Sequence, residues 1–86
     1  MHLATDRADW AYNWAIKNCV QSKDSRSLAF FVEASGLYRK FCDAAFAHNI
    51  EPLPFAQFWT MLQIAFPGIE AKRNSTGNIF TGIRYA

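Results

Sequence analysis

Apolar residues between Pro54 and Phe66 recur at three- and four-residue intervals, which places them on one side of a helix. Pro52 and Pro54 suit the start of a helix, because the N–H that proline lacks would be unpaired in the first turn anyway. Pro67 and Gly68 end the helix, since both residues disfavour a helix interior. The sequence therefore predicts a helix over 54–66 whose apolar face consists of Phe55, Phe58, Leu62, Ala65 and Phe66.

Two strand-like stretches follow this helix, at Ile69–Arg73 and Ile79–Tyr85. The polar residues Asn74, Ser75, Thr76, Gly77 and Asn78 separate them and are typical of the tip of a hairpin. Strand alternation predicts that Lys72 and Arg84 share one solvent side. The inward-facing set is then Ile69, Ala71, Ile79 and Ile83.

The N-terminal part of the chain predicts another helix, capped by Thr5 or Asp6 and running to about Val20. Its apolar arc is wide, so we expect it to be mostly buried or to dock onto another molecule. That arc consists of Trp10, Ala11, Trp14, Ala15 and Cys19. A polar connection follows over Gln21–Ser27.

The segment Leu28–Val32 has two interpretations. Its aromatic and β-branched residues favour a strand, whereas a single glycine at position 36 would also allow one long helix over Ser27–Asn49. Ser35 is a good N-cap before a new helical pattern, which favours the strand. The helical pattern comprises Leu37, Phe41, Ala44, Ala45 and His48, widened by Tyr38, Cys42 and Phe46, with Arg39, Lys40 and Asp43 facing water. Asn49 suits a left-handed helix stop.

The order helix, strand, helix, helix, strand, wing, strand predicts an α+β fold of the winged-helix type. In that arrangement the first strand joins the hairpin in a small three-stranded antiparallel sheet. The 86 residues form one domain, and their 51% apolar content excludes a disordered chain.

Charge adds a local signal. The net charge is only +2, and the excess positive charge lies after Phe66. That segment contains three basic residues, Lys72, Arg73 and Arg84, and one acidic residue, Glu70. This is a small basic footprint and not the strongly basic face of a tight DNA-binding protein.

Other chemistry finds little support in the sequence. Cys19 and Cys42 are too few for a disulfide framework or a zinc site, so we expect free thiols in a reducing compartment and no metal or cofactor. His2 and His48 lie at no recognisable catalytic spacing, which predicts a non-enzymatic protein. The chain shows no signal peptide or membrane span, so we expect an intracellular protein without glycosylation at the Asn74-Ser75-Thr76 sequon.

Several short segments of the chain match the sequence motifs of a known family of domains. These are Val32–Tyr38 with Phe41, Pro52–Phe55 with Phe58 and Leu62, Phe66-Pro67, Lys72-Arg73 and Thr81–Ile83. Over roughly residues 30–85 the chain resembles the RFX-type winged-helix domain and the related C-terminal domain of phage, plasmid and large-DNA-virus helicase-primases. Most of the matches are core or turn positions.

The resemblance implies a role in replication or transcription and binding to duplex DNA. RFX-type domains place the wing in the major groove and the preceding helix towards the minor groove. By position, the implied wing contacts are Lys72, Arg73 and the tip residues Asn74 to Asn78. The wing here is shorter and less arginine-rich, and Thr60 and Gln63 stand where that family has a lysine and an arginine. Those differences remove phosphate-neutralising charge.

The helix before the wing has candidate contacts of its own. Gln57, Thr60 and Gln63 lie away from the apolar face, at a spacing that suits phosphate or base-edge contacts, although an ordinary solvated face would look the same. Lys72 and Arg84 could hold a phosphate or simply keep a sheet edge soluble.

Two functional hypotheses follow. The first is weak DNA binding through the 72–78 wing and the exposed face of the 54–66 helix. The second is a protein–protein contact with no direct DNA contact, in which Trp59, Ile64 or the tryptophans of the first helix serve as anchors. Neither requires a membrane.

Overall fold

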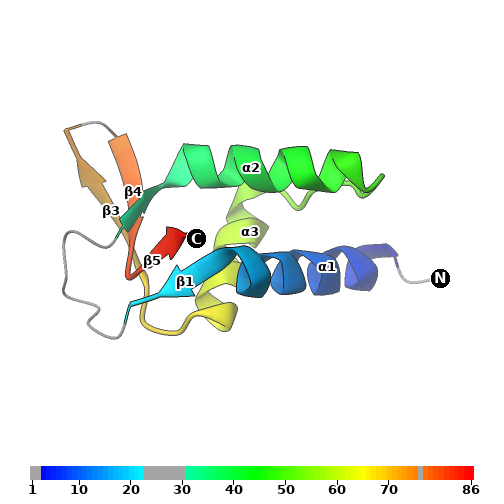
Figure 1. Cartoon of the computed structure of the whole chain (residues 1–86), viewed down its shortest axis with the longest axis horizontal. Coiled ribbons are helices and arrows are strands. Elements are labelled where there is room, and N and C mark those ends of the chain that lie inside the picture. The colour runs from blue at the N-terminus through cyan, green and yellow to red at the C-terminus, as the bar shows by residue number, and fades with distance from the viewer. Residues whose placement is uncertain (1–2, 23–30, 76) are drawn as a thin grey trace.

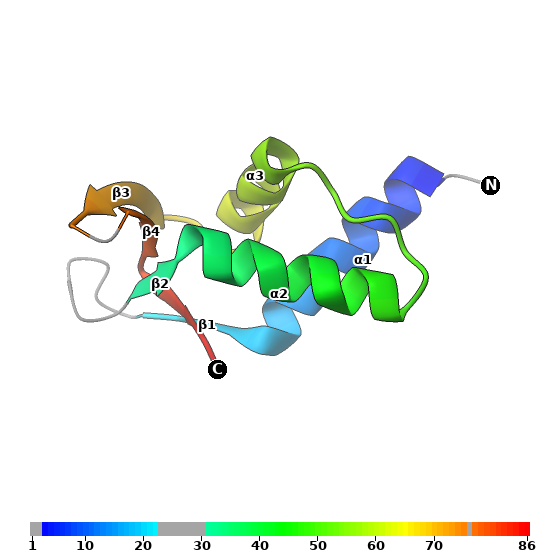
Figure 2. The same cartoon turned by 90° about the horizontal axis from the view of Figure 1, so that it is seen from above.

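The computed structural model describes residues 3–22, 31–75 and 77–86, which form a small α+β domain. The described residues contain three helices and two small antiparallel sheets, an arrangement compatible with a winged helix (Figure 1). Both views place the strands together at one end of the molecule, away from the N-terminus (Figures 1 and 2). The elements are α1 (Leu3–Asn18), β1 (Cys19–Gln21), β2 (Phe31–Glu33), α2 (Ala34–Ala47), α3 (Phe55–Ala65), β3 (Glu70–Asn74), β4 (Gly77–Thr81) and β5 (Ile83–Tyr85).

Helix α1 differs from the prediction at both ends. It begins at Leu3, so Thr5 and Asp6 lie inside the helix and the predicted cap is wrong. It stops at Asn18, and Cys19 to Gln21 form β1, which pairs with β5. The helical apolar pattern continues through Cys19, but backbone pairing with a distant segment determines the conformation there.

The strand interpretation before α2 is confirmed for Phe31 and Val32, and the strand continues to Glu33, whereas positions 28–30 lie outside the described residues. Glu33, and not Ser35, occupies the N-cap position, so Ser35 lies in the first helical turn. The predicted stop is confirmed, because α2 ends at Ala47 and Asn49 has a φ of 57°. Phe46 is exposed and does not widen the buried face, contrary to expectation.

Helix α3 follows the predicted pattern closely. It begins after Pro54 and ends at Ala65, and Phe58 and Leu62 are fully buried. Met61 is buried as well, while Phe55 is half-exposed at the first turn. Gly68 then turns the chain with a φ of 94°.

The tip of the hairpin is shorter than predicted. Asn74 belongs to β3, and Gly77 and Asn78 belong to β4, so only positions 75 and 76 lie between the strands. The predicted strand Ile79–Tyr85 is divided at Gly82, which has a φ of 90°. Strands β2, β4 and β3 form the predicted three-stranded sheet in that order, whereas β5 pairs with β1 in a second sheet.

The register of the β3–β4 hairpin differs from the predicted assignment of its side chains to the two faces of the sheet. Ala71 lies opposite Phe80, and Lys72 lies opposite Ile79. Ala71 and Ile79 therefore point to opposite faces of the sheet, because side chains of paired residues share a face. The predicted common inner face is wrong for Ala71, which is exposed.

Aromatic rings form the centre of the core. Phe41 of α2 stacks on Phe58 of α3 with ring centroids 4.7 Å apart, and Trp14 of α1 meets Phe41 at 5.5 Å. These three rings join all three helices, so each helix buries its apolar face against the other two.

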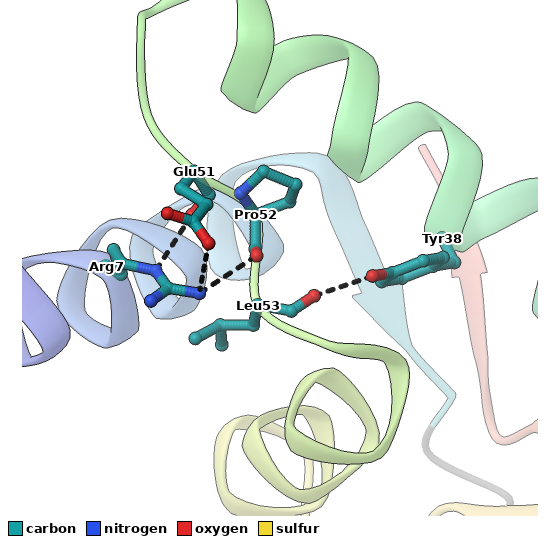
Figure 3. A network of polar contacts seen from close by, with 5 residues as sticks. All are labelled: Arg7, Tyr38, Glu51, Pro52 and Leu53. Atoms are coloured by element: carbon teal, nitrogen blue, oxygen red, sulfur yellow. Dashed lines mark hydrogen bonds and ion pairs between the residues drawn. The ribbon is translucent and has the colours of Figure 1, made fainter.

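Polar contacts fix the connection between α2 and α3 (Figure 3). The Arg7 guanidinium of α1 donates to the carbonyls of Glu51 and Pro52 at 3.0 and 3.1 Å, and it lies 3.9 Å from the Glu51 carboxylate. The Tyr38 hydroxyl donates to the Leu53 carbonyl at 2.7 Å. The start of α3 is therefore held from both α1 and α2.

Candidate nucleic-acid interface

Helix α3 presents two flanks to different parts of the molecule. Its sequence, FAQFWTMLQIA, contains no charged residue. Gln57, Thr60 and Gln63 are exposed, as predicted. The Thr60 hydroxyl donates to the Ala56 carbonyl at 3.1 Å, which leaves its oxygen as an acceptor.

One flank of α3 faces α1 across a groove of about 410 Å³, which we call the α1–α3 groove. Gln57 and Thr60 line it, whereas Gln63 does not. Apolar and polar residues of both helices complete the lining: Arg7, Ala8, Asp9, Tyr12, Leu53, Met61 and Ile64.

The other flank of α3 faces the β3–β4 hairpin across a depression of about 400 Å³, the hairpin pocket. Three of the predicted wing residues, Lys72, Arg73 and Asn78, line this pocket. Its remaining lining consists of Ala34, Phe55, Trp59, Ala71 and Phe80. By the register, Arg73 and its partner Asn78 share the sheet face of Phe80, whereas Lys72 starts from the opposite face with Ile79. The structure therefore brings Arg73 together with aromatic rings of α3, and separates it from Gln57 and Thr60.

Lys72 has an ionic partner on its own strand. Its ammonium nitrogen lies 3.4 Å from a carboxylate oxygen of Glu70, and both side chains are more than half exposed. An exposed pair of this kind contributes little to stability, so a phosphate can replace the carboxylate at small cost.

The tip residues are placed by the turn. The Asn74 side-chain oxygen accepts a hydrogen bond from the Gly77 backbone N–H at 3.1 Å, which closes the hairpin. Ser75 is exposed, and Thr76 lies outside the described residues. Asn74 therefore has a structural role whatever it binds.

Arg84 does not join the hairpin cations in one strip. It lies in β5 opposite Val20, in the two-stranded sheet, while Lys72 lies in β3 of the other sheet. The predicted common strip of Lys72 and Arg84 is wrong because the turn at Gly82 moves the chain from one sheet to the next.

Sequence reasoning assigned Phe55 to the core and overlooked its place at the candidate site. The ring is 43% exposed and lines the hairpin pocket. Its position in the first turn of α3 was the available signal, because a residue at a helix end has fewer neighbours to cover it. Trp59, considered from the sequence as an anchor for a protein partner, stacks its ring on Phe80 with centroids 4.5 Å apart.

Cys19 is buried and Cys42 partly buried, and both are free thiols. Burial raises the pKa of Cys19 to about 11, which keeps it protonated and unreactive near neutral pH.

Within residues 3–22, 31–75 and 77–86, no group of three or more His, Cys, Asp or Glu side chains could hold a metal ion. No helix in the described part of the chain has the length and apolar character needed to cross a membrane.

No protein-family model matches the chain, and a search among curated proteins finds no match.

Proposed function

We propose that this chain is a winged-helix module that binds DNA through the β3–β4 hairpin and the adjoining flank of α3. The order of the elements supports the winged-helix assignment, because a helix directly precedes the hairpin. The sheet order β2-β4-β3 supports it as well, since the strand before α2 joins the hairpin on the side of β4.

The observation that carries the proposal is that Arg73 and Asn78, paired on one face of the hairpin, line the hairpin pocket together with Lys72, which starts from the opposite face. Cations that neutralise phosphates supply most of the non-specific affinity for DNA, and asparagine amides also bind phosphate oxygens. Gln57, Thr60 and Gln63 are exposed neutral hydrogen-bonding groups elsewhere on α3, and Gln57 and Thr60 line the groove on its other flank. The small net charge of +2 makes this a weak binder by itself.

The likeness to RFX-type and helicase-primase C-terminal domains supports a setting in replication or transcription inside the cell. In that setting the module would position DNA and perform no chemistry of its own.

The proposal is tested by measuring anisotropy of a labelled duplex at several salt concentrations. We expect the Lys72→Ala/Arg73→Ala variant to bind more weakly. Its plot of log affinity against log salt should be shallower by about 2, because about one unit is lost for each phosphate contact removed.

A Lys17→Ala/Lys40→Ala variant removes the same charge from α1 and α2 and serves as the control. Equal losses in the two variants would show that overall charge, and not the hairpin, governs binding. If the wild-type domain binds no duplex even at low salt, duplex binding by this domain is wrong.

A second candidate function is protein contact through the α1–α3 groove. Ile64 is 68% exposed and Tyr12 40% exposed on the two sides of this groove. Exposed apolar side chains that share one groove favour a protein partner.

We expect the Ile64→Lys variant to lose proteins captured by cross-linking in a cell extract, while the Lys72→Ala/Arg73→Ala variant retains them. The reverse pattern would exclude the groove.

A further inference from the structure

The hairpin pocket continues into a neighbouring depression of about 380 Å³, which we call the helix pocket. The two pockets share Ala34, Phe55 and Asn78, so they form one trough between the hairpin and the helices α2 and α3. The helix pocket adds Glu33, Ser35, Tyr38, Arg39 and Gly77 to the lining.

Aromatic rings line the trough in fixed orientations. Trp59 stacks on the buried Phe80 with centroids 4.5 Å apart and 16° between the planes, and Phe55 stacks on the same ring at 6.1 Å and 25°. Tyr38 meets Phe55 edge-on at 5.2 Å. Rings already held by neighbours lose little conformational freedom when a ligand stacks on them.

Cations accompany these rings along the trough. Lys72 and Arg73 line the hairpin pocket, and Arg39 lines the helix pocket. Glu33 is the acid that lines the helix pocket, and Glu70 is engaged with Lys72 at the rim. The lining is therefore positive on balance, which disfavours a cationic ligand and favours an anionic one.

Flat apolar rings beside cations match the two parts of an unpaired nucleotide, whose base stacks on a ring while its phosphate meets a cation. A duplex cannot use the rings in this way, because its base faces are covered by the neighbouring base pairs. Each pocket, at about 400 and 380 Å³, falls within the usual size range of small-ligand sites.

We propose that the trough binds unpaired bases of a single nucleic-acid strand, with Phe55 and Trp59 as the stacking surface and Lys72, Arg73 and Arg39 at the phosphates. This inference rests on the proposed DNA-binding function and specifies its substrate. The module then prefers a single strand, or a junction with one, to continuous duplex.

The test compares a labelled oligo(dT), an oligo(U) of the same length and a labelled duplex by anisotropy. Wild-type protein should bind the single strands more tightly than the duplex, and the ratio between oligo(dT) and oligo(U) identifies the preferred sugar. Phe55→Leu should weaken single-strand binding by at least about fivefold, the lower end of the range for loss of one stacked base. It should weaken duplex binding less than single-strand binding and leave the salt slope unchanged, because the phosphate contacts remain.

Phe46→Leu is the matched control, because Phe46 is 65% exposed near the end of α2 and lines neither pocket. A second readout is quenching of tryptophan fluorescence by oligo(dT), which Trp59→Phe should reduce without unfolding the protein.

The outcomes separate the two proposals. Duplex and single strands bound equally, with Phe55→Leu matching Phe46→Leu, would overturn the stacking trough and leave hairpin-dependent DNA binding intact. Absence of binding to all three probes would overturn the proposed function itself. Single-strand preference that is lost in Phe55→Leu alone supports the trough.

Discussion

At the scale of single residues, Cys19 shows how position determines chemistry. It lies where α1 passes into β1, and its side chain is buried. Burial disfavours the thiolate and raises its pKa from 9.0 to about 11. The residue is therefore an apolar core group, and its reactivity depends on unfolding.

This shift predicts a pH-dependent stability. The folded chain holds the Cys19 proton more tightly than the unfolded chain. The contribution is therefore fully present below pH 9.0 and is lost as the pH rises towards about 11. Urea unfolding at about pH 8 and about pH 10.5 should show a larger fall in the free energy of unfolding for wild type than for Cys19→Ala.

Tyr38 titrates in the same direction, because burial and its hydrogen bond to Cys42 raise its pKa. It is present in both proteins, so its effect cancels in the comparison. Parallel losses in wild type and variant would contradict the assignment to Cys19.

At the scale of elements, the turn at Gly82 divides one predicted strand between two sheets. The residue is buried, has a φ of 90°, and lies against Ile69. Hydrophobic alternation continues across this position, so the sequence pattern alone predicts an unbroken strand. A glycine inside a strand pattern was the available sign of a bend.

Gly82→Ala should lower the free energy of unfolding by about 1–3 kcal/mol in a urea titration. Alanine at position 82 would have to adopt a φ of 90°, which is strained for a residue with a side chain, while its Cβ would lie at an ordinary contact distance of 3.4 Å from Ile69 Cγ2. Gly68→Ala tests the backbone cause by itself, because Gly68 has a φ of 94° and no atom within 4 Å of the new Cβ. It should lose a similar amount of stability.

Gly36→Ala provides the opposite control in α2, where the nearest atom is Glu33 Cβ at 3.8 Å and the φ is not positive. It should be neutral or stabilising by up to about 1 kcal/mol. A Gly82→Ala variant as stable as Gly36→Ala would show that the turn tolerates a side chain.

At the scale of the whole molecule, periodicity predicted the helices and the three-stranded sheet but not the pairing between distant segments. The apolar pattern of β1 continues that of the preceding helix, so the strand is recognised only from its pairing with β5. Lys72 and Arg73 were predicted as candidate contacts from their position in the wing and from the local excess of positive charge. Phe55 was predicted as a core residue, although its ring is half-exposed at the candidate site. Spacing along a helix shows which residues share its apolar face, but it does not show which of them the neighbouring sheet covers.

The pairing of β1 with β5 has a consequence for folding kinetics. It joins Cys19 to Tyr85, and the Ala86 N–H extends it by donating to the Asn18 carbonyl at 2.8 Å. The β3–β4 hairpin closes over two residues, whereas the β1–β5 pairing closes a loop containing most of the chain and carries a larger entropy cost. Formation of this pairing therefore depends most on the rest of the chain already being compact.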